Sequence, residues 1–140
     1  MKNQPYEILE HTADIYLRIK GQELEDLFKN AGLAVFQIAS RRQFIKDPQH
    51  IKLPVIQEAA NLEELFINWL NELLSLSSAK GVIFHDLKIN KLNETGIDAV
   101  ATGSNIINYK LNFEIKAATY HQLKVEHTAG GWIAEVILDV

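Results

Sequence analysis

The chain has 140 residues, of which 47% are hydrophobic and 23% charged, a composition that excludes an intrinsically disordered protein. It contains no cysteine, which excludes disulfides, thiolate metal sites and a cysteine nucleophile. The formal net charge of -4 argues against a protein that binds nucleic acid through its own surface, because such proteins are usually basic.

The N-terminal part of the chain predicts extended structure. Residues 6–10 form a short extended run, and the alternation of Ile15, Leu17 and Ile19 with polar neighbours predicts a strand with one buried face. Residues 1–5 are polar, and no run of about eighteen apolar residues occurs anywhere. We therefore expect a cytoplasmic protein without a targeting segment or a membrane span.

Two amphipathic helices are predicted next. The first begins near Leu24, has an acidic first turn, and carries apolar residues at three- and four-residue spacing, with Arg41 and Arg42 near its C-terminal end. The second begins after Asn61, whose side chain is expected to cap it, and ends before residue 81. Alternating apolar residues at positions 51, 53 and 55 predict a strand between the two helices.

The rest of the chain predicts antiparallel strands. Residues 109–116 show the clearest alternation in the sequence, and residues 93–96 and 129–131 have turn composition. We therefore predict an α+β fold with one domain covering residues 1–140. It is expected to be a two-layer sandwich, with two helices packed on a mainly antiparallel or mixed sheet of about six or seven strands.

Carboxylates from the two ends of the chain form the first candidate site. The last strand runs into Asp139 and Val140, so the terminal carboxylate is expected beside the Asp139 side chain, where a hard divalent cation would relieve their repulsion. Asp14, in the loop before a strand, is the natural third ligand. The alternative is that Asp14 only caps its loop and Asp139 is a solvated tail, and spacing alone leaves both open.

Four further residues are candidates for a role near this site. Lys116 could pair with a phosphate or with the carboxylates, or it could be an ordinary solvent-facing lysine. Tyr120 and His121 offer a hydrogen-bond donor and a titratable ring, and His11 lies in the loop that carries the acid. No phosphate-binding glycine loop, zinc motif or nucleophile elbow is present, so these patterns define no reaction.

Three segments together resemble the archease family. They are the sequence YEILEHTADIYL at residues 6–17 with the acid-fronted helix after it, LEELFINWLNELL at residues 62–74, and the C-terminal pair IKAATYHQLKV and WIAEVILDV. The resemblance spans essentially the whole chain. Tyr16 and Ala118 depart from the family pattern, in which a small residue and a valine are common.

The resemblance implies a non-enzymatic partner of an RtcB-type, GTP-dependent RNA ligase of tRNA splicing, which promotes ligase guanylylation and multiple turnover. It also implies a divalent cation, often calcium, bound by Asp14, Asp139 and Val140, and an activating role for Lys116. His11, Tyr120 and His121 would support the site, and RNA would be met only through the ligase. Two alternatives remain: a chaperone-like interaction module, and a small metal-dependent hydrolase with His11 or His121 as its base.

Overall fold

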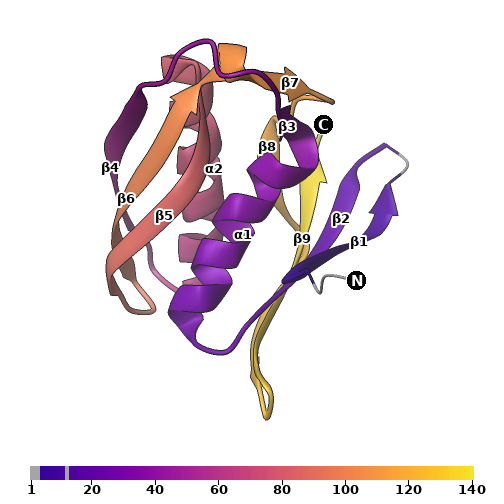
Figure 1. Ribbon diagram of the computed structural model, residues 1–140. Helices are drawn as coiled ribbons and strands as arrows, with labels where there is room; N and C mark the ends of the chain where they lie inside the picture. The colour runs from indigo at the N-terminus through magenta and orange to yellow at the C-terminus, as the bar shows by residue number, and fades with distance from the viewer. Residues whose placement is uncertain (1–3, 12) are drawn as a thin grey trace.

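The computed structural model describes residues 4–11 and 13–140, apart from the side chains of Glu10 and His11. Within this part of the chain there are two α-helices and nine strands (Figure 1). In chain order the elements are β1 (Tyr6–His11), β2 (Ile15–Gly21), α1 (Leu24–Ala39), β3 (Ser40–Arg42), β4 (His50–Glu58), α2 (Leu62–Lys80), β5 (Val82–Leu92), β6 (Gly96–Asn105), the 3-10 helix η1 (Ile106–Asn108), β7 (Tyr109–Leu111), β8 (Ala117–Thr128) and β9 (Gly131–Asp139).

The strands form three antiparallel sheets. A four-stranded sheet has the order β1-β2-β9-β8, a three-stranded sheet has the order β4-β6-β5, and β3 pairs with β7. The predicted α+β class, with two helices on antiparallel sheets, is confirmed. The strands of the described residues number nine, however, and they are divided among three sheets where the sequence predicted one sheet of six or seven.

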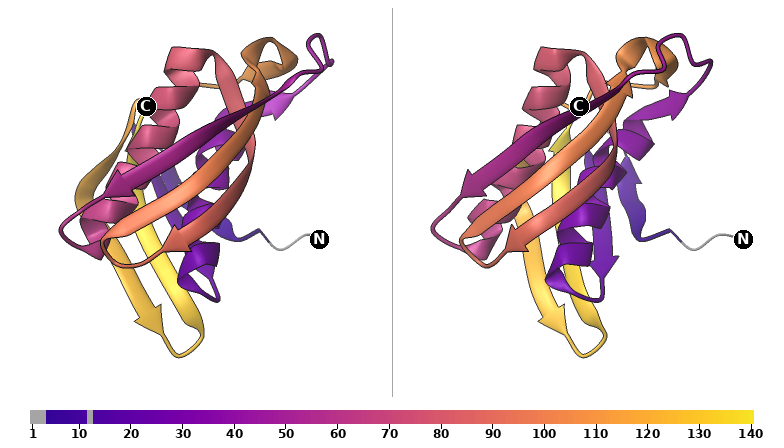
Figure 2. Two further views of the ribbon diagram at one scale, coloured as in Figure 1. Left: turned by 90° about the vertical axis from the view of Figure 1, so that its left-hand side faces the viewer. Right: turned by 60° about the vertical axis from the view of Figure 1, so that its left-hand side comes forward.

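Both helices lie between the two larger sheets, as Figures 1 and 2 show. Helix α1 packs against β2 on one side and β5 on the other, and α2 packs against β8 and β4. Each large sheet therefore has one face on the helices and one face toward solvent. Alternation along a strand reveals its buried face but not the sheet that it joins, which is why the sequence did not separate the sheets.

The core between the sheets is centred on aromatic side chains. The indole Nε1 of the fully buried Trp69 donates a hydrogen bond to the carbonyl oxygen of Phe28 at 2.8 Å, and Phe28 meets Phe66 edge to face at 5.3 Å. Gly32 allows a close approach here, because a Cβ at this position would lie 2.5 Å from Leu87 Cδ1. The contacts join α1, α2 and β5 into one packed unit.

The two helices end differently. The predicted cap of α2 is confirmed, since Asn61 Oδ1 accepts a hydrogen bond from the Glu64 backbone N–H at 2.9 Å, and Gly81 ends the helix in the left-handed conformation, φ 64°. Helix α1 ends at Ala39, so Arg41 and Arg42 lie on β3 and not in the helix. The two arginines are thus near the C-terminal end of the helix, as expected, but beyond its last turn.

The alternating segment 109–116 is not one strand. Only Tyr109–Leu111 belongs to β7, and the chain then crosses from the β3–β7 pair to the four-stranded sheet. The Asn112 N–H donates to Ala39 O at 2.8 Å, and Phe113 and the buried Ile115 pack against the core. A crossing segment that buries every second side chain shows the same alternation as a strand, although its backbone does not pair with a neighbouring strand.

Candidate functional site

The end of the four-stranded sheet at which β9 finishes gathers the predicted site residues. In the β2–β9 ladder Ile15 lies opposite Leu138, and in the β8–β9 ladder Ala118 lies opposite the same Leu138. One residue beyond these pairs, Asp14 and Asp139 lie at the ends of neighbouring strands. The register thus brings together two carboxylates that are 125 residues apart in the sequence, a separation given by 139 minus 14.

The C-terminal residues are held in place at this end. The Lys116 backbone N–H donates a hydrogen bond to the Asp139 carbonyl oxygen at 2.8 Å, which ties the start of β8 to the last residue of β9. The side chain of Val140 is half-buried and packs against the core, whereas Asp139 and Asp14 are exposed. The end of β9 is therefore anchored, with both aspartates accessible to solvent.

Lys116 lies at the same end, although not on a strand. It directly precedes β8, and its side chain is exposed. The alternation of residues 109–116 predicted a strand that includes Lys116, and this is wrong because the segment before β8 crosses between sheets. Its position next to Asp139 comes instead from the backbone hydrogen bond between the two residues.

Tyr120 and His121 belong to an irregular part of β8. The register shifts between Thr119, opposite Ile137, and Lys124, opposite Glu135, so four residues of β8 face one residue of β9. Both side chains are exposed, and among the described residues neither shares a hydrogen bond or ion pair with Asp14, Lys116 or Asp139. The structure does not join them to the carboxylates.

His11 ends β1, where its backbone pairs with Ile15. Its side chain lies outside the described part of the structure. The predicted support of the carboxylates by this ring therefore stays a prediction.

The donor set at this end is made of oxygen atoms. Asp14 and Asp139 take part in no ion pair within residues 4–11 and 13–140. Oxygen ligands of this kind fit a hard divalent cation. Across the same described ranges, no group of three or more His, Cys, Asp or Glu side chains is arranged to hold a metal, so such a site would depend on the terminal carboxylate.

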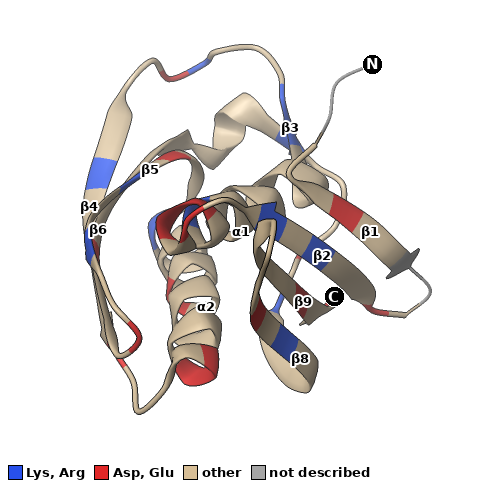
Figure 3. Cartoon of the chain, turned by 90° about the horizontal axis from the view of Figure 1, so that it is seen from below, with Lys and Arg blue, Asp and Glu red and all other residues tan. Residues whose placement is uncertain are grey.

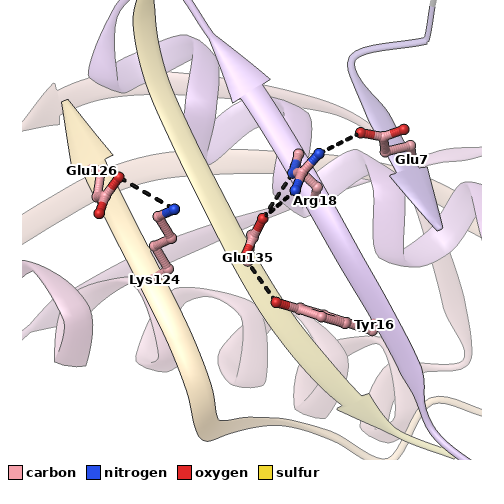
Figure 4. Close-up of polar contacts among 6 residues, drawn as sticks. All are labelled: Glu7, Tyr16, Arg18, Lys124, Glu126 and Glu135. Atoms are coloured by element: carbon pink, nitrogen blue, oxygen red, sulfur yellow. Dashed lines mark hydrogen bonds and ion pairs between the residues drawn. The ribbon is translucent and has the colours of Figure 1, made fainter. Parts of the chain in front are cut away.

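A polar network that the sequence did not predict lies on the solvent face of the same two strands (Figure 4). Glu135, whose side chain is only 11% exposed, accepts a hydrogen bond from the Tyr16 hydroxyl at 2.8 Å. Arg18 binds the same carboxylate through Nε at 2.8 Å and Nη2 at 2.7 Å, and its Nη1 lies 3.1 Å from Glu7 Oε1. The only sequence signal was a single acid within the apolar run WIAEVIL.

The network fixes the alignment that the site requires. The hydrogen bonds from Tyr16 and Arg18 lower the pKa of Glu135, and the bond to Glu135 raises the pKa of Tyr16. Arg18 lies directly opposite Glu135 in the β2–β9 ladder, so the network favours one register of these strands. The same register places Asp14 and Asp139 at the ends of neighbouring strands.

The amino-acid sequence is similar to those of one protein family over nearly its whole length. Residues 6–140 match the model of the Archease protein family (MTH1598/TM1083). The chain is 35% identical over 145 residues to a protein archease of Methanosarcina mazei, covering 99% of this chain and 98% of the relative. It is 33% identical over 141 residues to a protein archease of Pyrococcus furiosus, covering 96% and 98%.

Two solved structures share the fold. The solution structure of Methanobacterium thermoautotrophicum protein 1598 has a TM-score of 0.70 at 24% identity and covers 99% of this chain and 100% of its own. The crystal structure of a Thermotoga maritima protein titled "archease, possible chaperone" has a TM-score of 0.66 at 24% identity and covers 96% of each chain. Among the described residues, neither helix has the length and hydropathy needed to cross a membrane.

Proposed function

Because this chain belongs to the archease protein family, we propose that it is a non-enzymatic activator of an RtcB-type, GTP-dependent RNA ligase of tRNA splicing in the cytoplasm. It would promote formation of the ligase–GMP intermediate and allow repeated turnover. The observation that carries the proposal is the pairing of Ile15 with Leu138, which sets Asp14 and Asp139 side by side at one exposed end of the sheet.

We assign different roles to the carboxylates and to the lysine of the proposed site. Asp14, Asp139 and the carboxylate of Val140 would hold a divalent cation, for which calcium is our first choice because all the donors are hard oxygens. A cation bound there supplies positive charge at an otherwise anionic end. Lys116, exposed and adjacent in space to Asp139, would approach the phosphate oxygens of the ligase-bound nucleotide and stabilise their charge.

The exposure of these groups suits action on a partner. Asp14, Lys116 and Asp139 all face solvent, so they can enter the active-site pocket of another protein. A protein of net charge -4 is also attracted electrostatically to a ligase whose RNA-binding cleft is basic. RNA would then be contacted through the ligase.

A multiple-turnover RNA ligation assay with the cognate ligase tests this function. We expect the ligase to stop after about one turnover alone and to continue when this protein is added. Lys116→Ala should reduce the stimulation, while Lys88→Ala, which alters an exposed lysine on β5, should not. A ligase that turns over equally well without the protein would contradict the proposal.

The alternative of a chaperone has its own support, because the related Thermotoga maritima structure carries the words "possible chaperone" in its description. A chaperone would suppress aggregation of an unrelated unfolded protein, and it would need neither a cation nor Lys116. Suppression that survives both Asp14→Asn and Lys116→Ala, together with no effect on the ligase, would favour this function.

A further inference from the structure

Two neighbouring segments expose an unusual set of apolar side chains. Phe44 is 82% exposed and Ile45 59%, and Ile107 and Leu111 are each about half exposed. The pairing of β3 with β7 brings the two segments together. We call these four residues the apolar tip. Large apolar side chains held in water forgo the stabilisation of burial, so a cluster of them marks a surface that contacts another molecule.

The tip is held rigidly by Asn108, which is fully buried. Its side-chain Oδ1 accepts hydrogen bonds from the N–H groups of Lys46 at 2.8 Å and Asp47 at 3.0 Å, and its Nδ2 donates to Asp47 O at 2.7 Å. The Gln43 N–H donates to the Asn108 carbonyl oxygen at 2.8 Å. Phe44 and Ile45 therefore lie between two anchored points, and ordering them on binding costs little entropy.

Positive charge surrounds the tip. Arg41 lies directly opposite Lys110 in the β3–β7 ladder, an arrangement of like charges that disfavours the pairing, and Arg42 and Lys46 are exposed beside it. None of the four forms an ion pair within residues 4–11 and 13–140. Figure 3 shows Lys and Arg on β3 and on the loop that follows it.

The carboxylate of Asp47, the one acid in the loop between β3 and β4, already accepts hydrogen bonds. Asp47 accepts hydrogen bonds from the Gln49 N–H at 3.0 Å and from Asn105 Nδ2 at 3.3 Å, so its carboxylate serves the loop and not the neighbouring cations. A local basic surface on a chain of net charge -4 is complementary to an acidic patch on a partner, which can lie outside a basic cleft of the same partner.

The tip lies at the same end of the molecule as the carboxylate site. In Figure 1 and in both views of Figure 2, the C-terminus and the loop between β3 and β4 occupy the same end, with the β8–β9 hairpin at the other. The two surfaces lie on different sides of this end (Figure 2).

We propose that the apolar tip, with Arg41, Arg42, Lys46 and Lys110 around it, is the docking surface for the ligase, through a ligase pocket that is apolar and rimmed by carboxylates. This inference rests on the proposed function, which it extends by separating docking from activation. Three of the four tip residues are aliphatic and do not stack on bases, which favours a protein over RNA. Aromatic and arginine side chains are also the groups that dominate protein interfaces.

The test compares binding with activation. Guanylylation of the ligase is measured as the concentration of this protein is raised, for wild type, the double variant Phe44→Ser/Ile45→Ser, and Asp14→Asn. The double variant should raise the half-saturating concentration about tenfold or more and keep the maximal stimulation. Asp14→Asn should lower the maximal stimulation and keep the half-saturating concentration unchanged. Ile56→Ser, at a 62% exposed residue of β4, is the matched control and should behave as wild type.

Direct binding to the purified ligase by calorimetry separates the two proposals. If the double variant loses affinity for the ligase but the wild-type protein does not stimulate guanylylation, the docking surface is retained and the proposed function is rejected. Wild-type affinity in the double variant would overturn the docking surface alone. Charge reversal by Arg41→Glu/Lys110→Glu should also weaken binding and reduce its dependence on salt.

Other occupants of the tip would give different results. Binding of tRNA without ligase that is lost in Phe44→Ser/Ile45→Ser would assign the surface to RNA. A concentration-dependent dimer that the same substitutions dissociate would assign it to a second copy of the chain. Either result, with ligase affinity unchanged, overturns the proposal.

Discussion

Ile15 lies directly opposite Leu138 in the antiparallel pairing of β2 with β9, and both side chains are fully buried. This contact between the N-terminal and C-terminal strands is stabilised by the core, because a slip of one residue would turn the apolar side chains of one of the two strands out to solvent. Asp14, which precedes Ile15, and Asp139, which follows Leu138, are held at the ends of neighbouring strands for the same reason. The proposed cation site is therefore a consequence of the strand register.

The cation site predicts that the chain terminus is a ligand. Extending the chain by one glycine turns the Val140 carboxylate into an amide and moves the negative charge away. Calorimetric titration with calcium should show affinity lowered at least about tenfold in this variant and in Asp139→Asn, because each loses an anionic ligand. Glu94→Gln, in the distant 93–96 turn, is the control. Equal calcium affinity in all four proteins would exclude the terminal carboxylate as a ligand.

The network around Glu135 predicts a loss of stability when its charge is removed. Glu135→Gln should lower the free energy of unfolding by about 1 kcal/mol, a modest value because Arg18 is partly exposed and its charge is screened by solvent. Urea unfolding at pH 7 measures this change. No change at pH 7 would show that the network does not stabilise the β2–β9 pairing.

The same network predicts a pH dependence. The folded protein lowers the pKa of Glu135 below its ordinary value of 4.5, so the contribution is fully present above that value and is lost as pH falls through the folded-state pKa. The difference in stability between wild type and Glu135→Gln should therefore shrink at acidic pH. A difference that grows as the pH falls would contradict this assignment.

The rings of His50 and His85 are in contact, with His50 Nδ1 3.3 Å from His85 Nε2. Burial lowers the pKa of His85 below 6.5, and the charges of His50 and Arg42 lower it further, while Asp86 opposes them. Because the unfolded chain binds a proton at His85 more readily than the folded protein, the free energy of unfolding is highest above pH 6.5 and decreases as pH falls through the folded-state pKa of His85. His50→Ala should raise the pKa of His85 in an NMR titration. An unchanged value would show that His50 does not act on it.

Asn108 predicts a local effect on the loop that carries Phe44. Asn108→Ala removes three hydrogen bonds from a fully buried side chain and should lower the free energy of unfolding by about 2 kcal/mol. Hydrogen exchange should accelerate most at the amides of residues 46 and 47, which lose their acceptor. Uniform exchange across the chain would mean that Asn108 stabilises the fold as a whole and does not hold this loop in particular.

Local signals in the sequence predicted much of the fold. The apolar spacing and the cap at Asn61 located α2, because helix formation depends on neighbouring residues. The segment 109–116 was predicted wrongly, because its alternation reports burial and not strand pairing. The position of Arg41 and Arg42 on β3 depends on pairing with β7, a contact across about 70 residues that no local pattern reveals.

The sequence suggested some residues at this end of the sheet and missed others, because contacts that depend on strand pairing leave no local pattern. Asp139 was chosen because the terminal carboxylate would lie next to it, an argument that needs only the local sequence, and Asp14, in the loop before a strand, was added as the natural third ligand. Glu135, Tyr16 and Arg18 were missed, because their network exists only once β2 and β9 are aligned. The insertion of residues into β8 opposite Val136 likewise follows from the register of a distant strand.

The most direct test of the central claim is the single-turnover rate of ligase guanylylation with saturating wild type, Asp14→Asn or Asp139→Asn. We predict that both variants lose at least about tenfold of the stimulation while binding the ligase with wild-type affinity, and that Glu94→Gln loses none. Full stimulation by Asp14→Asn and Asp139→Asn would contradict the claim that these two carboxylates act together on the ligase.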